Sequence, residues 1–401
     1  MSDKHQIINT KIFDEDLIDS TYNKIEEYGS ATFERMLVPP TDGLKPVNRR
    51  ILFVLWEENV KDHTKMATLA GAVLRYHPHG DKSVSDAMSK MGQWFYMNYP
   101  LIDPQGNFGN LDGDSPSAPR YIEAKPSQFA IDVLLQDLDW HSVDYKQNYD
   151  FKRIEPVYLP ARLPLVLVEG TEGIAVAFSA SIPSHNISDV INMCIKYIKN
   201  KNISNEELVD GVFPDFPTGG IIVNKKEVEE YYKYQKPCSL HIRGKTRIDY
   251  KENTIIIEEL PYGVTFDKIR DAIIENRNSK KELSVFNKVL RAERNNKQNY
   301  WEIEYRKDEN LNNALKNLYL YTPLDKSRPL QFIININNKP KLVTIKEIIE
   351  YWYDFRVQVK KRIFTHEMNT LQNKVHILEG IYKSYSKIDE IISTIRGSTN
   401  K

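Results

Sequence analysis

The stretch DGLKPVNRRILFVLWE, residues 42–57, places a cationic turn directly before a predicted helix. Apolar residues recur in it three and four positions apart, which is the spacing of one helix face: Val47, Ile51, Val54 and Leu55. Similar spacing predicts a second helix over 64–74, and a third helix, over 83–95, follows the turn YHPHGD of residues 76–81. Short helices joined by tight turns favour a helix-turn-helix or winged-helix arrangement here.

The rest of the chain changes character several times. Residues 1–30 are typical of an amphipathic helical arm, and residues 158–218 are strand-like and rich in proline. Residues 219–335 mix strand-like runs with helices, as in an α/β domain. Residues 344–396 predict one long helix with a coiled-coil seam, whose register breaks near Leu378. Such a helix needs a partner helix to cover its apolar stripe.

Composition excludes several classes of protein. Hydrophobic residues make up 41% of the 401 positions, enough for sizeable cores, and 55 basic residues balance 55 acidic ones. Zero net charge excludes a uniformly basic nucleic-acid coat but allows a local basic groove. Cys194 and Cys238 cannot form a four-cysteine zinc site or a disulfide framework, and no signal peptide is visible. The most apolar stretch, 163–182, is interrupted by Glu169 and Glu172, so no membrane span is expected.

Turn-forming phrases, several of them cationic, are concentrated between residues 42 and 121. Rigid turns that present Arg, Lys or His suit a phosphate backbone, which is bound by such side chains and by main-chain N–H groups. The chain contains no P-loop and no dinucleotide-binding fingerprint, so ATP binding by this chain is not expected. The phrases are DGLKPVNRR (42–50), YHPHGD (76–81), QGNFG (105–109), DGD (112–114) and APRY (118–121).

The pair Arg120-Tyr121 is the best candidate for covalent chemistry. A tyrosine phenol can attack phosphorus and hold a phosphodiester, provided that a cation and a metal or base assist it. Arg120 could stabilise the negative charge that develops. With 23 tyrosines in the chain, the pair taken alone is more simply a structural neighbour pair.

The phrases, in this order and at these separations, resemble the DNA-cleaving subunit of type IIA DNA topoisomerases, which includes the A subunits of gyrase and topoisomerase IV and the T-even phage medium subunit. PDFPTGG, ELPYGV and HILEGI extend the resemblance over essentially the whole chain. The resemblance implies an α+β multidomain fold. Its parts would be an N-terminal helical arm (1–29), a winged-helix, CAP-like DNA-cleavage domain (30–155), a tower α/β domain (156–338) and an incomplete first coiled-coil helix (339–401).

The resemblance also implies roles for individual residues. Tyr121 would be the nucleophile that forms a 5′-phosphotyrosyl link, with Arg120 and Arg35 assisting at the scissile phosphate. Ile174 would wedge between base pairs and bend the DNA. Taken alone, these residues are more simply turn, surface or core residues. The other implied DNA-binding residues are Lys45, Arg49, Arg50, His77 and His79.

The implied activity is an ATP-dependent double-strand break that lets a second duplex pass. Mg²⁺ and ATP would be bound by a partner subunit that carries the ATPase and TOPRIM domains, so no metal site is assigned to Asp112 or Asp114 in this chain. The other expected partners are double-stranded DNA and a second copy of the chain.

The exit gate and the DNA-wrapping β-pinwheel have no counterpart in the sequence. The sequence is therefore expected to be either a fragment or one product of a split gene, whose separate chain supplies the gate. Relaxation and decatenation are expected rather than negative supercoiling, in a bacterial or phage-infected cytoplasm, or in a nucleus or viral factory.

The chain departs from bacterial relatives at three positions of this resemblance. Asn48 replaces a histidine, Thr41 replaces an arginine, and Lys82 replaces a serine that helps to anchor quinolones, whereas the acidic Asp86 is retained. We therefore expect weak inhibition by quinolones. Two other classes stay open, a non-cleaving winged-helix DNA-binding module and a structural dimerisation subunit.

Overall fold

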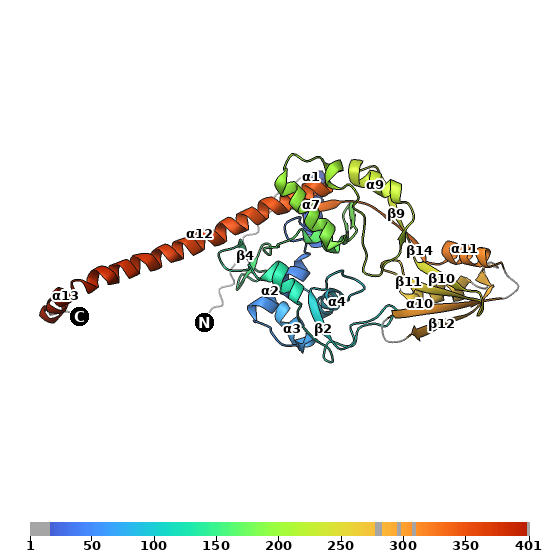
Figure 1. Cartoon of the computed structure of the whole chain (residues 1–401), viewed down its shortest axis with the longest axis horizontal. Helices are drawn as coiled ribbons and strands as arrows, with labels where there is room; N and C mark the ends of the chain where they lie inside the picture. Colours follow the sequence, from blue (N-terminus) through green and yellow to red (C-terminus); the bar gives the residue numbers. More distant parts are fainter. Residues whose placement is uncertain (1–16, 277–282, 295–297, 307–309, 399–401) are drawn as a thin grey trace, which may run out of the picture.

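The computed structural model describes residues 17–276, 283–294, 298–306 and 310–398. Figure 1 shows a body of short helices and small sheets, from which one long helix projects toward the C-terminus. The helices are α1 (Leu17–Met36), α2 (Pro46–Glu57), α3 (Met66–Val73), α4 (Asp81–Met91), α5 (Gln128–Ala130), the π-helix η1 (Ile131–Leu135), α6 (Leu165–Glu169), α7 (Ile187–Lys199), α8 (Asn205–Leu208), α9 (Lys225–Tyr234), α10 (Phe266–Asn276), α11 (Leu311–Tyr321), α12 (Ile345–Tyr385) and α13 (Ile388–Gly397).

The strands form several small antiparallel sheets, in the orders β1-β3-β2, β10-β11-β13-β12, β14-β9-β8, β15-β16, β4-β5 and β6-β7. These sheets and the long helix confirm an α+β protein. The strands are β1 (Thr64–Lys65), β2 (Ile102–Gln105), β3 (Glu123–Pro126), β4 (Tyr145–Gln147), β5 (Ile154–Pro156), β6 (Thr171–Ala175), β7 (Phe178–Ile182), β8 (Ile221–Ile222), β9 (Ser239–Arg243), β10 (Lys245–Asp249), β11 (Thr254–Glu259), β12 (Phe286–Arg294), β13 (Gln298–Tyr305), β14 (Asp325–Pro329), β15 (Ile333–Ile336) and β16 (Lys339–Leu342).

Helix α2 is the centre of the N-terminal core and confirms the helix predicted there. Pro46 occupies its first turn, where a fixed φ suits the helix and a missing N–H costs nothing. Residues 51–55 are all buried, and helices α3 and α4 pack against α2. Phe53 makes an edge-on contact with the ring of Tyr76, at 5.3 Å between centroids. This core fixes the turns that precede and follow these helices.

Residues 165–169 correct the strand-like interpretation of the stretch that begins at residue 158. The four apolar residues of LVLVE are all buried, but they form the short helix α6. A short, continuously apolar run suits a buried helix as well as a buried strand, so its pattern could not decide between them. Gly170, with φ of 68°, ends the helix and leads into the hairpin β6–β7.

The four-stranded sheet β10-β11-β13-β12 lies with α10 and α11 at the end of the body opposite the long helix (Figure 1). Trp301 and Phe266 stack in its core, with 5.3 Å between ring centroids. The loop that carries DGD reaches this region, because Phe266 N–H donates to the Leu111 carbonyl at 2.8 Å and Trp301 Nε1–H donates to Asp112 Oδ1 at 2.7 Å. Asp112 therefore has a structural partner here.

Helix α12 begins with a capping box, in which Thr344 and Glu347 bond each other's main-chain N–H groups. Asp137 holds the N-terminal part of α12 to the body, because it contacts Arg356 of this helix and also pairs with Arg162 at 2.7 Å. Beyond the base, an apolar stripe is exposed, and no described segment covers it: Phe364, Met368, Leu371, Val375 and Leu378.

The single helix predicted over 344–396 is wrong in one respect. Helix α12 continues without interruption through Leu378 and ends at Tyr385, and α13 starts at Ile388. The hydroxyls of Ser384 and Ser386 donate to carbonyls of the preceding turn, both at 2.8 Å. Serine side chains that bond locally in this way compete with the helix ladder, and these two lie beside the break.

Residues 1–16 of the predicted arm lie outside the described residues. The remainder forms the start of α1, which continues to Met36 and so runs past the predicted end of the arm. Among the described residues, no helix is long and apolar enough to cross a membrane.

Candidate functional site

Arg120 and Tyr121 lie in a turn immediately before β3. The Tyr121 N–H donates to the Ala118 carbonyl at 2.9 Å, which closes the turn. The Tyr121 side chain is 64% exposed, and the Arg120 guanidinium lies 4.5 Å from the centre of its ring. The phenol is therefore open to solvent, with a cation beside it.

The backbone on either side of Tyr121 is fixed to the start of α3. The first N–H groups of a helix have no partner within the helix, and here two of them bind the turn. Met66 N–H donates to the Ile122 carbonyl at 3.0 Å, and Ala67 N–H donates to the Pro119 carbonyl at 3.1 Å. The side chain of Ile122 is buried, so an exposed tyrosine stands on a rigid support.

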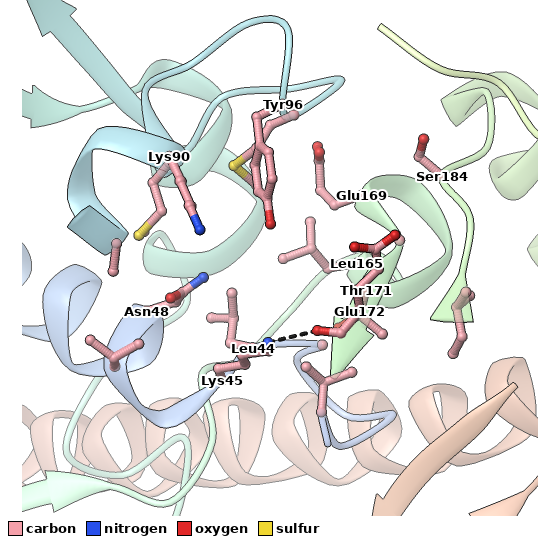
Figure 2. Close-up of a pocket in the computed structure, with 18 of the residues that line it drawn as sticks. Leu44, Lys45, Asn48, Lys90, Tyr96, Leu165, Glu169, Thr171, Glu172 and Ser184 are labelled. Carbon is pink, nitrogen blue, oxygen red and sulfur yellow. Dashed lines mark hydrogen bonds between the residues drawn. The ribbon is translucent and has the colours of Figure 1, made fainter. Parts of the chain in front are cut away.

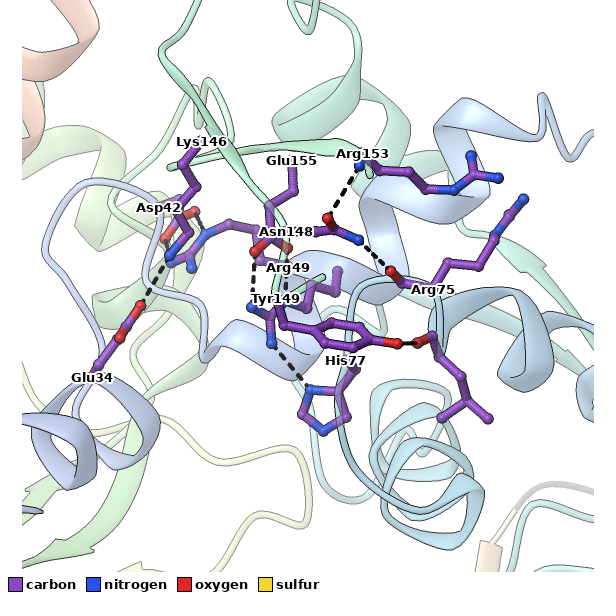
Figure 3. Close-up of polar contacts among 12 residues, drawn as sticks. Glu34, Asp42, Arg49, Arg75, His77, Lys146, Asn148, Tyr149, Arg153 and Glu155 are labelled. Carbon is purple, nitrogen blue, oxygen red and sulfur yellow. Dashed lines mark hydrogen bonds and ion pairs between the residues drawn. The ribbon is translucent and has the colours of Figure 1, made fainter. Parts of the chain in front are cut away.

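Arg50 and His77 form a second group, of which Figure 3 labels His77 and the neighbouring Glu155. Arg50 binds both carboxylate oxygens of Glu155, at 2.6 and 2.8 Å, and its third nitrogen lies 3.2 Å from His77 Nδ1. Because a guanidinium only donates, Nδ1 must accept, and the proton of a neutral His77 lies on Nε2. Burial, Arg50, His79 and Arg35 together lower the pKa of His77 to about 4. His77 is thus a neutral donor near neutral pH.

His79 and Arg35 lie at the open side of this group. The rings of His77 and His79 are 4.6 Å apart between centroids, and His79 is exposed. Arg35, also exposed, is in the last turn of α1 and close enough to act on the charge of His77. The structure therefore brings four of the predicted site residues to one place.

Arg49 lies in the interior, although it is adjacent to Arg50. Its guanidinium binds both oxygens of Asp42, at 2.6 and 2.9 Å, and donates to the Leu44 carbonyl at 2.9 Å. Asp42 in turn accepts from the Leu159 N–H at 2.9 Å (Figure 3 labels the Arg49–Asp42 pair). These bonds hold the DGL turn against residues 158–166, where a side chain on Gly43, at φ of 65°, would meet the Val166 backbone.

The hairpin β6–β7 carries Ile174 and is bonded to Lys45. The Lys45 ammonium donates to the Glu172 carbonyl at 2.7 Å, as Figure 2 shows, and Ile174 on the same strand is 80% exposed. Gly173 packs so closely on the carbonyl of Met36 that a Cβ would stand 2.1 Å from it. The hairpin therefore abuts the end of α1, next to Arg35.

A cavity of about 270 Å³ lies between α2, α4 and this hairpin. Figure 2 shows the Lys90 ammonium and the Tyr96 phenol pointing into it. Glu169, on its wall, accepts the N–H groups of Asn98 and Tyr99, both at 2.9 Å, and burial raises its pKa to about 8. Burial and Lys90 lower the pKa of Lys45.

The positions that depart from bacterial relatives are spread over this region. Asn48 and Asp86 line the cavity, whereas Lys82 is exposed on the first turn of α4. The buried hydroxyl of Thr41 has no hydrogen-bond partner among the described residues.

Apart from Arg49, which binds Asp42 in the interior, the predicted residues form three groups, namely the Tyr121 turn, the His77 group and the hairpin. Within the described residues, no hydrogen bond, ion pair or ring contact joins Tyr121 to His77 or His79. In the same part of the chain, no three His, Cys, Asp or Glu side chains lie close enough together to hold a metal. Asp114 is bonded to Asn110 at 2.7 Å.

Residues 35–401 match the family of the A subunits of DNA gyrase and topoisomerase IV. The chain belongs to this family. It is 39% identical over 394 residues to the DNA gyrase A subunit of Buchnera aphidicola subsp. Baizongia pistaciae, covering 96% of this chain and 46% of that protein. It is 37% identical over 378 residues to the DNA gyrase A subunit of Staphylococcus aureus (strain NCTC 8325 / PS 47), covering 92% and 42% respectively. The chain thus spans less than half the length of these relatives.

Family membership does not by itself identify the residues that support the site. Glu155, Glu169 and Arg328 were not singled out from the sequence, although each binds or neighbours a predicted site residue. Glu155 is 105 residues from Arg50, so no local pattern could have paired them. The signal available for Asp42 was stronger, because it lies only seven residues from Arg49 in the same phrase.

Proposed function

We propose that this chain is the breakage-and-reunion part of the A subunit of a type IIA topoisomerase, which cleaves both strands of a duplex and rejoins them. The observation that carries the proposal is the exposed Tyr121 beside Arg120, on a turn whose backbone is fixed to α3. A nucleophile that must reach a large substrate has to be exposed, and its support has to be rigid.

In the proposed reaction, the Tyr121 hydroxyl oxygen attacks phosphorus while the bond from phosphorus to the 3′-oxygen breaks. The phenol proton passes to solvent or a base, the 3′-oxygen takes up a proton, and the 5′ end stays on the tyrosine. One phosphodiester replaces another, so the reverse attack rejoins the strand without an external energy source. Arg120 would stabilise the charge on the phosphate. Mg²⁺, held by the partner subunit, would supply Lewis-acid assistance at the same phosphate.

The His77 group would bind the DNA backbone near the break. With Nδ1 occupied by Arg50, a neutral His77 can donate its Nε2–H to a phosphate oxygen at any pH well above 4. Arg35 and His79 would provide further donors at the open side, and Arg50 would fix the histidine. Arg49 would act indirectly, by holding the turn that positions Lys45.

The hairpin β6–β7 would bend the duplex, with Ile174 as the wedge. An isoleucine that is 80% exposed has no packing role of its own, and apolar side chains inserted between base steps kink DNA. Lys45, bonded to the same hairpin, would lie where a phosphate approaches.

For the architecture, we propose a winged-helix domain over 30–155, a tower domain over 156–338 and the first coiled-coil helix over 339–401, preceded by the arm of residues 1–29. The partners would be double-stranded DNA, a second copy of this chain and an ATPase subunit that holds Mg²⁺ and ATP. Relaxation and decatenation are the proposed outcomes of strand passage.

A plasmid cleavage assay tests the proposal. The chain is mixed with its ATPase partner, Mg²⁺ and supercoiled plasmid, quenched with detergent and digested with protease, alongside Tyr121→Phe. We expect linear DNA with protein on its 5′ ends, which the variant does not produce. Tyr28→Phe, another exposed tyrosine, is the matched control. Equal cleavage by wild type and Tyr121→Phe would overturn the assignment, and DNA binding without cleavage would favour a non-cleaving module.

A further inference from the structure

Arg328 is a nearly buried cation that belongs to none of the sequence phrases. It lies on β14, with its side chain 8% exposed. Its guanidinium is 2.5 Å from Glu172 Oε1 and 3.3 Å from the Ser181 hydroxyl. Glu172 is on β6 and Ser181 is on β7, so one side chain holds both strands of the hairpin.

The register of the hairpin shows which face of the ribbon Arg328 contacts. Glu172 faces Ser181 across the ribbon, and Ile174 faces Ser179 two residues further along. Residues two apart on a strand project from the same face, about 7 Å apart. Arg328 therefore binds the face from which Ile174 projects, at the next cross-strand pair on that face.

The same guanidinium also contacts the rest of the body. It lies 5.7 Å from the ring centre of Tyr262, whose hydroxyl donates to the Tyr96 carbonyl at 2.8 Å. Tyr96 belongs to the loop after α4. Arg328, on β14, thus contacts the hairpin and, through Tyr262, the loop after α4. A shift of one of these segments therefore affects the contacts of the others.

The charge of Glu172 explains why a cation is needed at this point. The Glu172 side chain is 60% exposed on the wedge face, so DNA that engages Ile174 brings phosphates toward a carboxylate. An unpaired carboxylate would repel them, and like charges brought together at an interface are costly. Lys45 bonds the main-chain carbonyl of Glu172, and Lys45 and Lys326 act on the Glu172 charge from further away, whereas Arg328 makes the ion pair with the side chain.

We infer that Arg328, through its ion pair with Glu172, is the positioning residue of the DNA-bending hairpin. It fixes the ribbon that carries Ile174 and cancels the charge that would otherwise oppose the duplex. This inference rests on the proposed function, in which Ile174 bends the DNA.

The test measures bending and binding separately. A duplex of about 30 base pairs, labelled at both ends for energy transfer, is bound to the complex of this chain with its ATPase partner and Mg²⁺. All proteins carry Tyr121→Phe so that cleavage does not interfere. Arg328→Met, Glu172→Gln and the double variant are compared with Ile174→Ala. Arg243→Met is the matched control, because Arg243 makes a similar ion pair with Asp325 in the same sheet, away from the hairpin.

We expect Arg328→Met to weaken binding about tenfold at low salt and to remove most of the bent population, since it leaves Glu172 unpaired on the DNA face. Glu172→Gln should lower the bent fraction roughly threefold without weakening binding. Adding Glu172→Gln to Arg328→Met should restore binding, which a general loss of stability would not allow. Arg243→Met should bend DNA like the parent.

Bending by Arg328→Met equal to that of the parent, or a double variant no better than Arg328→Met, would overturn the inference. If Arg328→Met does not fold, the exposed Glu172→Gln decides alone, and an unchanged bent fraction would refute the inference. Failure of Ile174→Ala to reduce bending would instead refute the wedge role in the proposed function.

Discussion

The Tyr121 turn and the adjacent arginines Arg49 and Arg50 use the same kinds of residue in opposite ways. In the turn, the backbone is bonded to α3 while the side chains of Arg120 and Tyr121 are exposed. At the two arginines, each guanidinium is bonded to a buried carboxylate, Arg49 to Asp42 and Arg50 to Glu155, and Arg50 also to His77, so little of their charge faces solvent.

This difference distinguishes a side chain that reacts with the substrate from side chains that hold the binding surface in shape. A nucleophile must move the last few ångströms to its target, so its side chain stays free. A residue that defines the shape of a binding surface works best when its own bonds are already formed, because no ordering remains to be done on binding. Substitutions in the two regions should therefore have different signatures.

The largest effect is expected at the exposed region. Replacing Arg120 by Ala should slow single-turnover cleavage about 10²–10³-fold, since the cation beside the phenol would stabilise the transition state. DNA affinity, measured by fluorescence anisotropy, should fall by less than about tenfold. Arg120→Lys should recover part of the rate. A loss confined to affinity would show that Arg120 only binds DNA.

Replacing Asp42 by Asn tests the bonded region. It should lower the free energy of unfolding by about 3 kcal/mol in urea denaturation, because Arg49 would remain buried without its counter-charge. Lys152→Gln, which removes a long ion pair at a side chain that is 80% exposed, is the control and should change nothing measurable. An unchanged stability of Asp42→Asn would mean that Arg49 can turn outward, and the contrast between the two regions would be lost.

His77→Ala should reduce cleavage roughly ten- to a hundredfold, with no change in the pH profile near 6.5, because the pKa of His77 is already about 4. An unfolded histidine takes up its proton below about pH 6.5. The unfolded state therefore binds more protons between that pH and about 4, and stability falls as the pH is lowered through this range.

Removing His77 should weaken that fall in stability, which thermal denaturation at several pH values measures. His185, buried with a pKa of about 4 as well, contributes the same sign and remains in the variant. DNA binding that strengthens below pH 6.5 in the wild type but not in His77→Ala would show that His77 acts as a cation.

The sequence predicted the elements whose signals are local. Helix α2 follows from its apolar spacing and Pro46, and the long helix from the absence of proline. The interpretation of residues 165–169 failed because a fully apolar run has no polar positions whose spacing would distinguish a helix from a strand. The break after Tyr385 lies beside two serines that bond locally, not at Leu378, where the heptad register changes.

Site residues could be predicted from the sequence where they lie in one of the short motifs, such as DGLKPVNRR or YHPHGD. Two adjacent arginines, Arg49 and Arg50, look equivalent in the sequence, yet one faces Asp42 and the other Glu155 and His77. Only the tertiary fold decides this, because Glu155 comes from a hairpin 105 residues away. Arg328 could not be found for the same reason, since its partner Glu172 belongs to a hairpin far earlier in the chain.

A substitution at Glu169 tests whether the cavity wall belongs with the bonded region. An unfolded glutamate loses its proton near pH 4.5, whereas burial raises the pKa of Glu169 to about 8. Between these values the folded state binds more protons, so stability falls as the pH rises. Glu169→Gln, neutral throughout, should flatten this fall, which the N–H groups of Asn98 and Tyr99 already limit by binding the carboxylate.

Denaturation in urea at a series of pH values measures the effect, and the exposed Glu230→Gln is the control. A flattened profile for Glu169→Gln alone would place the cavity wall with Asp42 and Arg49, as a region whose polar groups are committed to the fold. A profile that keeps its slope would mean that water reaches Glu169 through the cavity. The carboxylate would then be charged at neutral pH and would weaken the attraction of Lys45 and Lys90 for a phosphate.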